Sequence, residues 1–201
     1  MGTVAIVDYG VGNLKSVANA LSYLGCSSCI TADPAELERA DAIILPGVGA
    51  FPDAADRLRS GGLDQHVLAQ GQKKPVLGIC LGMQLLLEQG REVRPCPGLG
   101  VIRGTVDRIP TQSKLPHIGW NSLRFFHHSP LFRGLDEGAY VYFVHSFYAT
   151  DCTDAVIATT EYGAELTAAV ARGNVMGCQF HPEKSGDVGL AILKTFCEGS
   201  W

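Results

Sequence analysis

The stretch KPVLGICLGMQLLLE, residues 74–88, decides the fold. The apolar residues that follow Pro75 predict a short buried strand. Met83, Leu86 and Leu87 then recur at the spacing of one face of a helix. A strand, a tight turn and a helix therefore follow one another directly, and such units build α/β proteins.

The turn Gly78-Ile79-Cys80-Leu81-Gly82 places a cysteine between two glycines. A strained strand–turn–helix corner with glycines on either side is typical of a nucleophile elbow, because glycine removes the Cβ atoms that would clash there. At a helix N-terminus, the macrodipole and the free backbone N–H groups would favour the thiolate of Cys80 over the thiol. The alternative is an ordinary buried cysteine in a βα turn. The pentapeptide alone leaves both interpretations open.

Length and composition indicate a single globular domain over residues 1–201. A chain of 201 residues can bury a full core. Hydrophobic residues make up 46% and charged residues 18%, which argues against disorder. The net charge of −4 is mild and of the wrong sign for a nucleic-acid-binding protein.

The sequence also predicts where the protein resides. The N-terminal segment MGTVAIVDYG has an acid after only four apolar residues, which is typical of neither a signal peptide nor an anchor. No apolar run is long enough for a membrane span. Seven cysteines, an odd number, argue against a disulfide framework. We therefore expect a cytoplasmic protein without a membrane partner.

The first half of the chain alternates between apolar strands and helical patterns. Strands are predicted at residues 3–7, 28–31, 41–45 and 75–79, and helices at 14–24, 33–38 and 53–70. This alternation predicts an α/β fold with an open, doubly wound, mostly parallel sheet flanked by helices. In the second half, strand-like segments predict additional antiparallel strands at residues 98–109, 121–126, 140–150, 155–161 and 168–180. A last amphipathic helix is predicted from about Asp187 to Gly199.

Three further motifs do not support a cofactor or a metal. Gly10-Val11-Gly12 follows the first strand, but Lys15 stands where a dinucleotide-binding turn needs its third glycine. Cys26-Ser27-Ser28-Cys29 leads into a strand and has no second CxxC that would complete a zinc site. His127-His128 has no carboxylates at ligand spacing. We expect neither a cofactor nor a metal ion.

A nucleophilic cysteine needs a base and a group that orients the base. Gln179-Phe180-His181-Pro182-Glu183 offers both, and its preceding strand would deliver His181 to the carboxyl edge of the sheet. Pro182 fixes the backbone so that Glu183 can reach the imidazole. The glycines of Gly47-Val48-Gly49, at the end of a neighbouring strand, would let backbone N–H groups approach an oxyanion. The alternative for this last segment is a simple tight turn.

The combination of Gly-x-Cys-x-Gly with a later His-Pro-Glu resembles the class I, or triad, glutamine amidotransferases. Further segments are similar to one branch of that family, the glutaminase subunits of imidazole glycerol phosphate synthases: residues 8–14, 45–51, 78–84, 116–121, 142–146 and 179–184. The resemblance covers essentially the whole chain. It implies the flavodoxin-like sheet of that family.

The resemblance also implies roles for individual residues. Cys80 would be the nucleophile, His181 the base and acid, and Glu183 the residue that orients His181. The residues that would form the oxyanion and glutamine-binding sites are Gly47, Val48, Gly49, Leu81, Gln84, Ser146 and Phe147. Those that would lie at or near a partner interface are Asn13, Trp120, Asn121, Tyr142 and Lys184.

By the same resemblance, the expected reaction is hydrolysis of glutamine to glutamate and ammonia through a thioester. The ammonia would pass to a separate (β/α)8-barrel cyclase subunit in a heterodimer. That subunit would make imidazole glycerol phosphate and AICAR in histidine biosynthesis. The alternatives are the glutaminase of another synthase, for pyridoxal phosphate, anthranilate or GMP, and a catalytically silent binding partner.

Overall fold

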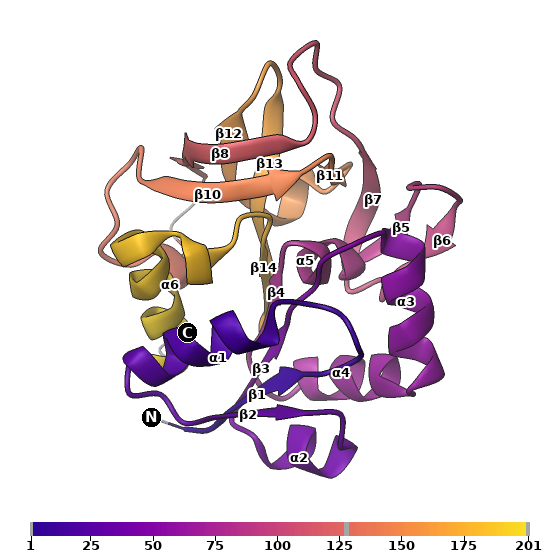
Figure 1. The fold of residues 1–201 in the computed structure, drawn as a ribbon, viewed down its shortest axis with the longest axis vertical. Coiled ribbons are helices and arrows are strands. Elements are labelled where there is room, and N and C mark those ends of the chain that lie inside the picture. Colours follow the sequence, from indigo (N-terminus) through magenta and orange to yellow (C-terminus); the bar gives the residue numbers. More distant parts are fainter. Residues whose placement is uncertain (1, 127–128, 200–201) are drawn as a thin grey trace.

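The computed structural model describes residues 2–126 and 129–199, which form three sheets and the helices that cover them (Figure 1). The largest sheet has eight strands in the order β2-β1-β3-β4-β14-β13-β12-β9. A four-stranded sheet has the order β11-β7-β5-β6, and β8 pairs with β10 as a two-stranded ribbon. His127 and His128 lie outside the described residues.

Apolar four-residue runs make the parallel half of the large sheet. Its strands are β1 (Val4–Val7), β2 (Ser28–Thr31), β3 (Ala42–Leu45), β4 (Val76–Ile79) and β14 (Val175–Cys178). Four of them, all except the edge strand β2, are buried along their whole length. Runs of this kind are typical of strands covered on both faces. The neighbours β3–β4 and β4–β14 run parallel, which places the ends of these strands at one edge.

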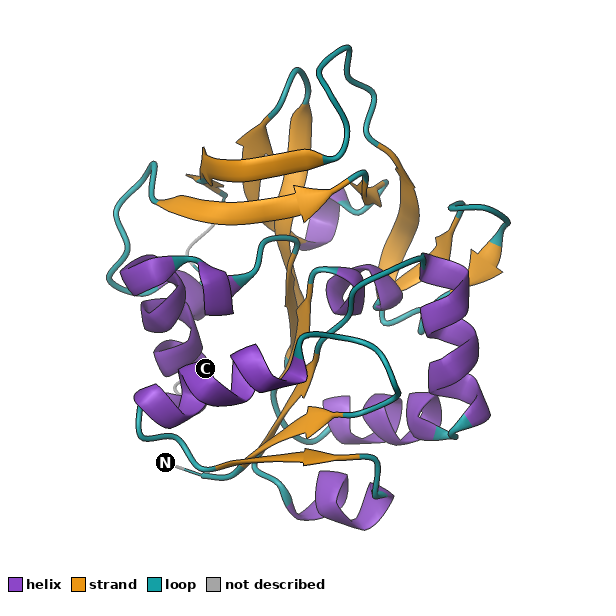
Figure 2. Cartoon of the chain, in the orientation of Figure 1, coloured by secondary structure: helices purple, strands orange, loops and turns teal. Residues whose placement is uncertain are grey.

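Helices cover both faces of this sheet (Figure 2). On one face, α1 (Leu14–Tyr23) and α6 (Gly186–Glu198) pack in a core with Ile6, Ile44 and Leu77. On the other face, alternate residues of the same strands pack with a second group of helices. These are α2 (Pro34–Arg39), α3 (Phe51–Ser60), α4 (Leu63–Gly71) and α5 (Leu81–Leu85). The expected doubly wound α/β arrangement is confirmed.

The remaining strands are antiparallel, apart from the parallel pair β5–β7. They are β5 (Leu87–Gly90), β6 (Cys96–Pro97), β7 (Ile102–Arg108), β8 (His117–Ser122), β9 (Arg124–Phe125), β10 (Tyr140–His145), β11 (Phe147–Thr150), β12 (Val156–Glu161) and β13 (Glu165–Arg172). Short 3-10 turns occupy Pro130–Phe132, Thr153–Ala155 and Pro182–Lys184.

Several predicted boundaries were wrong. The helix after Cys80 ends at Leu85, and Leu87 already begins β5, because backbone N–H groups of residues 99–102 take the carbonyls at this helix end. The helix predicted at residues 53–70 begins at Phe51 and divides at Gly61 and Gly62, where Gly62 has a φ of 68°. The segment 168–180 is a hairpin that turns at Gly173, with a φ of 56°.

Two further errors concern the strands beside the pocket described below. The strand predicted at residues 121–126 begins at His117 and is interrupted at Leu123. The strand predicted at residues 140–150 is two strands that belong to different sheets. The chain leaves the ribbon after His145 and joins β7 from Phe147 onward. Ser146 is therefore a crossing point between sheets.

Candidate active site

Cys80 lies on a strained corner between β4 and α5. Its φ of 54° and ψ of −110° are unusual for a residue with a side chain, and such strain concentrates at functional sites. The Cys80 N–H donates to the carbonyl of Cys178 on β14, at 2.8 Å. The strand, turn and helix thus follow one another as the sequence predicts, and the corner has the form of a nucleophile elbow.

The glycines of the corner allow α5 to lie against the end of β3. A Cβ atom on Gly82 would stand 1.8 Å from the carbonyl oxygen of Leu45. A Cβ atom on Gly78 would stand 2.7 Å from the backbone of Gly82. Both contacts are with backbone atoms, which cannot move aside as a flexible side chain can. Glycine is therefore required at both positions.

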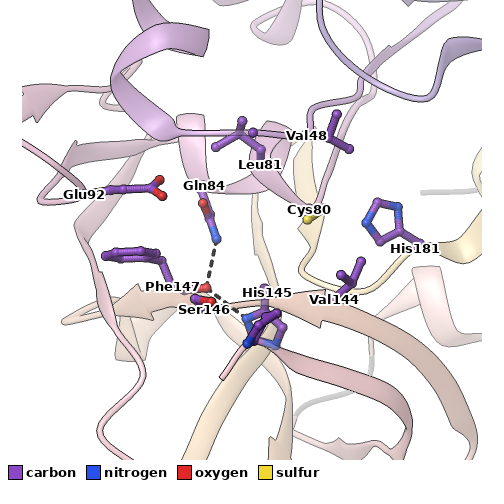
Figure 3. A pocket seen from close by; sticks show the side chains of 12 residues that line it. Val48, Cys80, Leu81, Gln84, Glu92, Val144, His145, Ser146, Phe147 and His181 are labelled. Carbon is purple, nitrogen blue, oxygen red and sulfur yellow. Dashed lines mark hydrogen bonds between the residues drawn. The ribbon is translucent and has the colours of Figure 1, made fainter. Parts of the chain in front are cut away.

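His181 and Glu183 form a buried pair beside Cys80. Since β14 is the parallel neighbour of β4, His181 emerges at the same edge of the sheet as Cys80. The His181 Nδ1–H donates to Glu183 Oε1 at 2.8 Å, and the two side chains are 2% and 1% exposed. His181 Nε2 has no hydrogen-bond partner among the described residues. Figure 3 shows the His181 ring and the Cys80 sulfur next to each other at the pocket wall.

The electrostatic surroundings favour a charged imidazole. Burial by itself lowers the pKa of His181, because a charged ring loses water. The nearby Cys80, together with the hydrogen bond and the charge of Glu183, outweighs this effect and raises the pKa of His181 to about 9. At neutral pH the ring therefore holds a proton that it can deliver to a leaving group.

A pocket of about 280 Å³ opens in front of Cys80 (Figure 3). Eight of the residues singled out in the sequence line it: Val48, Gly49, Cys80, Leu81, Gln84, Ser146, Phe147 and His181. Two lie just behind it. Gly47 packs against Leu81, where a Cβ atom would come within 2.9 Å, and Glu183 stands behind His181. The structure thus gathers four separate stretches of sequence around one cavity.

Comparison with known proteins identifies the family. Residues 5–198 match the family model described as glutamine amidotransferase class-I. The chain belongs to the class I glutamine amidotransferases. It is 49% identical, over 96% of its length and 93% of the relative's, to the imidazole glycerol phosphate synthase subunit HisH of Bacillus cereus. The HisH subunit of Bacillus thuringiensis is 46% identical over the same shares.

Solved structures agree with the family assignment at the level of the fold. A glutamine amidotransferase crystal structure superposes with a TM-score of 0.76 at 22% identity, covering 97% of this chain and 98% of the other. A putative GMP synthase subunit from Thermoplasma acidophilum has a TM-score of 0.75 at 22% identity, with 98% and 93% covered. As a class I glutamine amidotransferase of the HisH type, the chain is an enzyme, a glutaminase-type hydrolase.

Sequence reasoning missed several residues around the pocket of this amidotransferase. Glu92, Pro116, Val144 and His145 also line it. The carboxylate of Glu92 accepts a hydrogen bond from the N–H of Phe51 at 2.8 Å, at the start of α3. Glu92 lies in a charged loop with no motif, so no sequence signal distinguished it from a solvated side chain.

Gln179 is another missed residue. Its side chain is fully buried, and its Nε2–H donates to the sulfur of Cys80 at 3.6 Å. Gln84 Nε2 donates to Gln179 Oε1 at 2.9 Å and to the carbonyl of Phe147 at 3.0 Å. Gln179 belongs to the segment that contains His-Pro-Glu. The sequence did not indicate that its side chain points inward, toward Cys80.

The five predicted interface residues lie on neighbouring elements, since the 3-10 turn Pro182–Lys184 contacts both β10 and α1. Trp120 and Tyr142 contact each other edge to face on the outer side of the ribbon, with ring centroids 6.2 Å apart. The Asn121 amide instead donates to the carbonyl of Glu161 at 2.7 Å. Asn13 accepts from Ser16 Oγ at the start of α1, and Lys184 lies in the 3-10 turn that α1 contacts.

None of the helices within residues 2–126 and 129–199 is long and apolar enough to cross a membrane. No group of three or more His, Cys, Asp and Glu side chains in the described ranges is arranged to hold a metal ion.

Proposed function

We propose that this chain is the glutaminase subunit of an imidazole glycerol phosphate synthase and that Cys80, His181 and Glu183 are its catalytic triad. The observation that carries the proposal is the strained corner that presents Cys80 to a pocket beside a His181–Glu183 pair. The similarity to HisH subunits supports the assignment to an imidazole glycerol phosphate synthase.

In the proposed reaction, the Cys80 thiolate attacks the carboxamide carbon of glutamine. The C–N bond then breaks, and His181 gives its proton to the departing nitrogen, which leaves as ammonia. The acyl group remains on Cys80 as a thioester. Water, deprotonated by His181, hydrolyses the thioester and releases glutamate. Glu183 holds the imidazole in the orientation that both proton transfers need.

The negative charge that develops on the carboxamide oxygen needs hydrogen-bond donors. We assign this role to backbone N–H groups of Leu81 and of the Gly47–Gly49 segment, which flank Cys80 at the pocket wall. The φ of 104° at Gly49 gives that peptide an orientation that residues with side chains rarely adopt.

The rest of the pocket suits the amino-acid end of glutamine. Backbone groups of Ser146 and Phe147 and the side chain of Gln84 line the wall. The carboxylate of Glu92 faces the same cavity and would pair with the α-ammonium group. The α-ammonium group and the α-carboxylate group would thereby be recognised by different walls of the pocket.

We further propose that ammonia passes to a (β/α)8-barrel cyclase subunit, which makes imidazole glycerol phosphate and AICAR. The ribbon offers an apolar docking face, since Ile118, Trp120 and Tyr140 are 58%, 55% and 58% exposed. None of the described cysteines forms a disulfide bond, which fits the reducing cytoplasm. Co-purification of the chain with the cyclase subunit, and glutamine-dependent cyclase activity of the pair, test the proposal. No complex and no glutamine turnover would refute it.

Replacing Glu183 with glutamine should move the alkaline limb of the pH–rate profile to lower pH. The carboxylate stabilises the imidazolium, so its removal lowers the pKa of His181 from about 9. The proton donor is then lost at a lower pH than in the wild type. The measurement is kcat for glutamine hydrolysis by the complex between pH 6 and about 10, given the window that this pKa sets. An unshifted limb would contradict the pairing.

Replacing His181 with alanine should slow the alkylation of Cys80 by iodoacetamide near neutral pH. The imidazolium that accompanies the thiolate is removed, and only the thiolate reacts at an appreciable rate. Mass spectrometry of the Cys80 peptide against time gives the rate. The same substitution at the exposed His66 on α4 serves as the control and should leave the rate unchanged. Equal alkylation rates in both variants would argue against a Cys–His pair.

A further inference from the structure

Two buried histidines outside the triad face each other across the ribbon. His117 on β8 and His145 on β10 are register partners, 2% and 6% exposed. His117 Nδ1 lies 3.0 Å from His145 Nε2. Neither residue has a role in the proposed reaction, and a pair of apolar side chains would fill the same space without the cost of burying polar atoms.

The hydrogen-bond partners define one protonation pattern. His145 Nδ1 lies 2.9 Å from the carbonyl of Phe147, and a carbonyl only accepts, so the proton is on His145 Nδ1. In a neutral ring, Nε2 of His145 is then an acceptor, and His117 Nδ1 must donate to it. His117 Nε2 is left as an acceptor and faces the amide Nδ2 of Asn121 at 3.5 Å. Every bond in the series points the same way, toward Phe147.

The surroundings keep both rings uncharged. The ring of His117 stacks between Phe143 and Tyr162, with centroids 4.9 Å and 4.0 Å away. Burial lowers the pKa of His117. For His145, burial is also the main cause, and with the nearby His117 and His181 it outweighs the bond to Phe147 and lowers the pKa to about 4. A second proton on His145 would put N–H against N–H at the 3.0 Å contact, and a second proton on His117 would face the amide N–H of Asn121 at 3.5 Å.

This series of hydrogen bonds ends at Phe147, in the wall of the glutamine pocket. The Phe147 carbonyl accepts from both His145 Nδ1 and Gln84 Nε2, which fixes the direction of this peptide. Gln84 continues through Gln179 to the sulfur of Cys80. The other end is Asn121, which follows the exposed Trp120 on β8 and whose amide is oriented by the N–H of Ser122.

We propose that His117 and His145 are positioning residues: an uncharged imidazole pair that holds the Ser146–Phe147 wall in its glutamine-binding orientation and ties it to the exposed strand β8. The proposal rests on the function proposed above. It makes the pair responsible for the affinity of the pocket, whereas the triad is responsible for the chemistry.

The central test compares two substitutions of His145. Asparagine carries an N–H at the place of Nδ1 and can still donate to the Phe147 carbonyl, whereas leucine cannot. In the complex with the partner subunit, His145→Leu should raise KM for glutamine by about tenfold, the cost of one lost buried hydrogen bond, with kcat within about twofold of wild type. His145→Asn should restore KM to near the wild-type value. His66→Leu is the matched surface control.

A second variant and a chemical readout separate positioning from general damage. His117→Phe keeps the stacking between Phe143 and Tyr162 but removes the donor to His145, and it should raise KM by a smaller factor than His145→Leu. Cys80 in both variants should react with iodoacetamide at the wild-type rate. Labelling by 6-diazo-5-oxo-L-norleucine, which has the amino-acid end of glutamine, should need higher concentrations. If His145→Leu does not fold, His117→Phe decides the question.

The outcomes are distinct. Unchanged KM in His145→Leu, or an equal rise in His145→Leu and His145→Asn, overturns the positioning role. Nitrogen-15 NMR of the wild type should show both rings protonated on Nδ1 alone at neutral pH, and any other form overturns the assigned pattern. A wild-type complex that does not hydrolyse glutamine refutes the proposed function instead, while the NMR result still tests the pair.

Discussion

Replacing Cys80 with alanine should lower glutamine hydrolysis by about 10⁴-fold or more, to the background level. Without the sulfur no thioester can form, and the remaining members of the triad have nothing to activate. Cyclisation supplied with ammonium salts should continue at the wild-type rate, because the change leaves the partner's active site intact. The two rates are measured on the same complex, with glutamine or ammonium chloride as the nitrogen source.

The control for Cys80→Ala is Cys29→Ala, the same substitution at a half-buried cysteine of the edge strand β2. It should leave both rates unchanged. Glutamine hydrolysis that survives in Cys80→Ala would remove Cys80 from the reaction. Loss of the ammonia-dependent rate would show that the substitution disrupts the complex, and the assignment of roles would fail.

Replacing Gly82 with alanine should destabilise the protein strongly. The new Cβ atom would stand 1.8 Å from the Leu45 carbonyl oxygen, so α5 must move away from β3. Forced overpacking against backbone costs about 3 kcal/mol or more in the free energy of unfolding. The movement also displaces Cys80 and Leu81, so hydrolysis should be lost in any folded fraction. Urea unfolding followed by circular dichroism measures the stability.

Gly61→Ala is the matched control for Gly82→Ala. Gly61 ends α3 with a φ of −83°, and the nearest atom to an added Cβ lies at 3.6 Å. Alanine fits there without strain and should change stability by less than about 1 kcal/mol. Equal stabilities of the Gly82 and Gly61 variants would show that the packing of α5 on β3 is looser than the structure has it.

The sequence was informative wherever a local pattern determines the structure. Apolar runs such as the one that ends at Ile79 became buried strands, because a doubly wound sheet covers both of their faces. The two glycines and the cysteine of the elbow stand within five residues, which left an elbow and a buried cysteine both open until the later His-Pro-Glu segment favoured the elbow. His181 and Glu183 share one short turn, so their contact could also be expected.

What the sequence could not provide depends on contacts between distant segments. The chain leaves the ribbon at Ser146 because β10 pairs with β8 while β11 pairs with β7, and neither pairing has a local signal. α5 stops early because residues 99–102 take its last carbonyls. The contact between His117 and His145 joins positions 28 residues apart, and each histidine alone has the appearance of an ordinary core residue.

The pairing of β4 with β14 has a consequence for the tolerance of the enzyme to insertions and deletions. Four residue pairs, from Val175 opposite Val76 to Cys178 opposite Ile79, set the distance between Cys80 and His181. Slipping this ladder by one residue would shift His181 by about 3.3 Å relative to Cys80. Length changes in loops that lie away from the pocket therefore leave this spacing unchanged, whereas a single-residue deletion inside either strand would misalign Cys80 and His181.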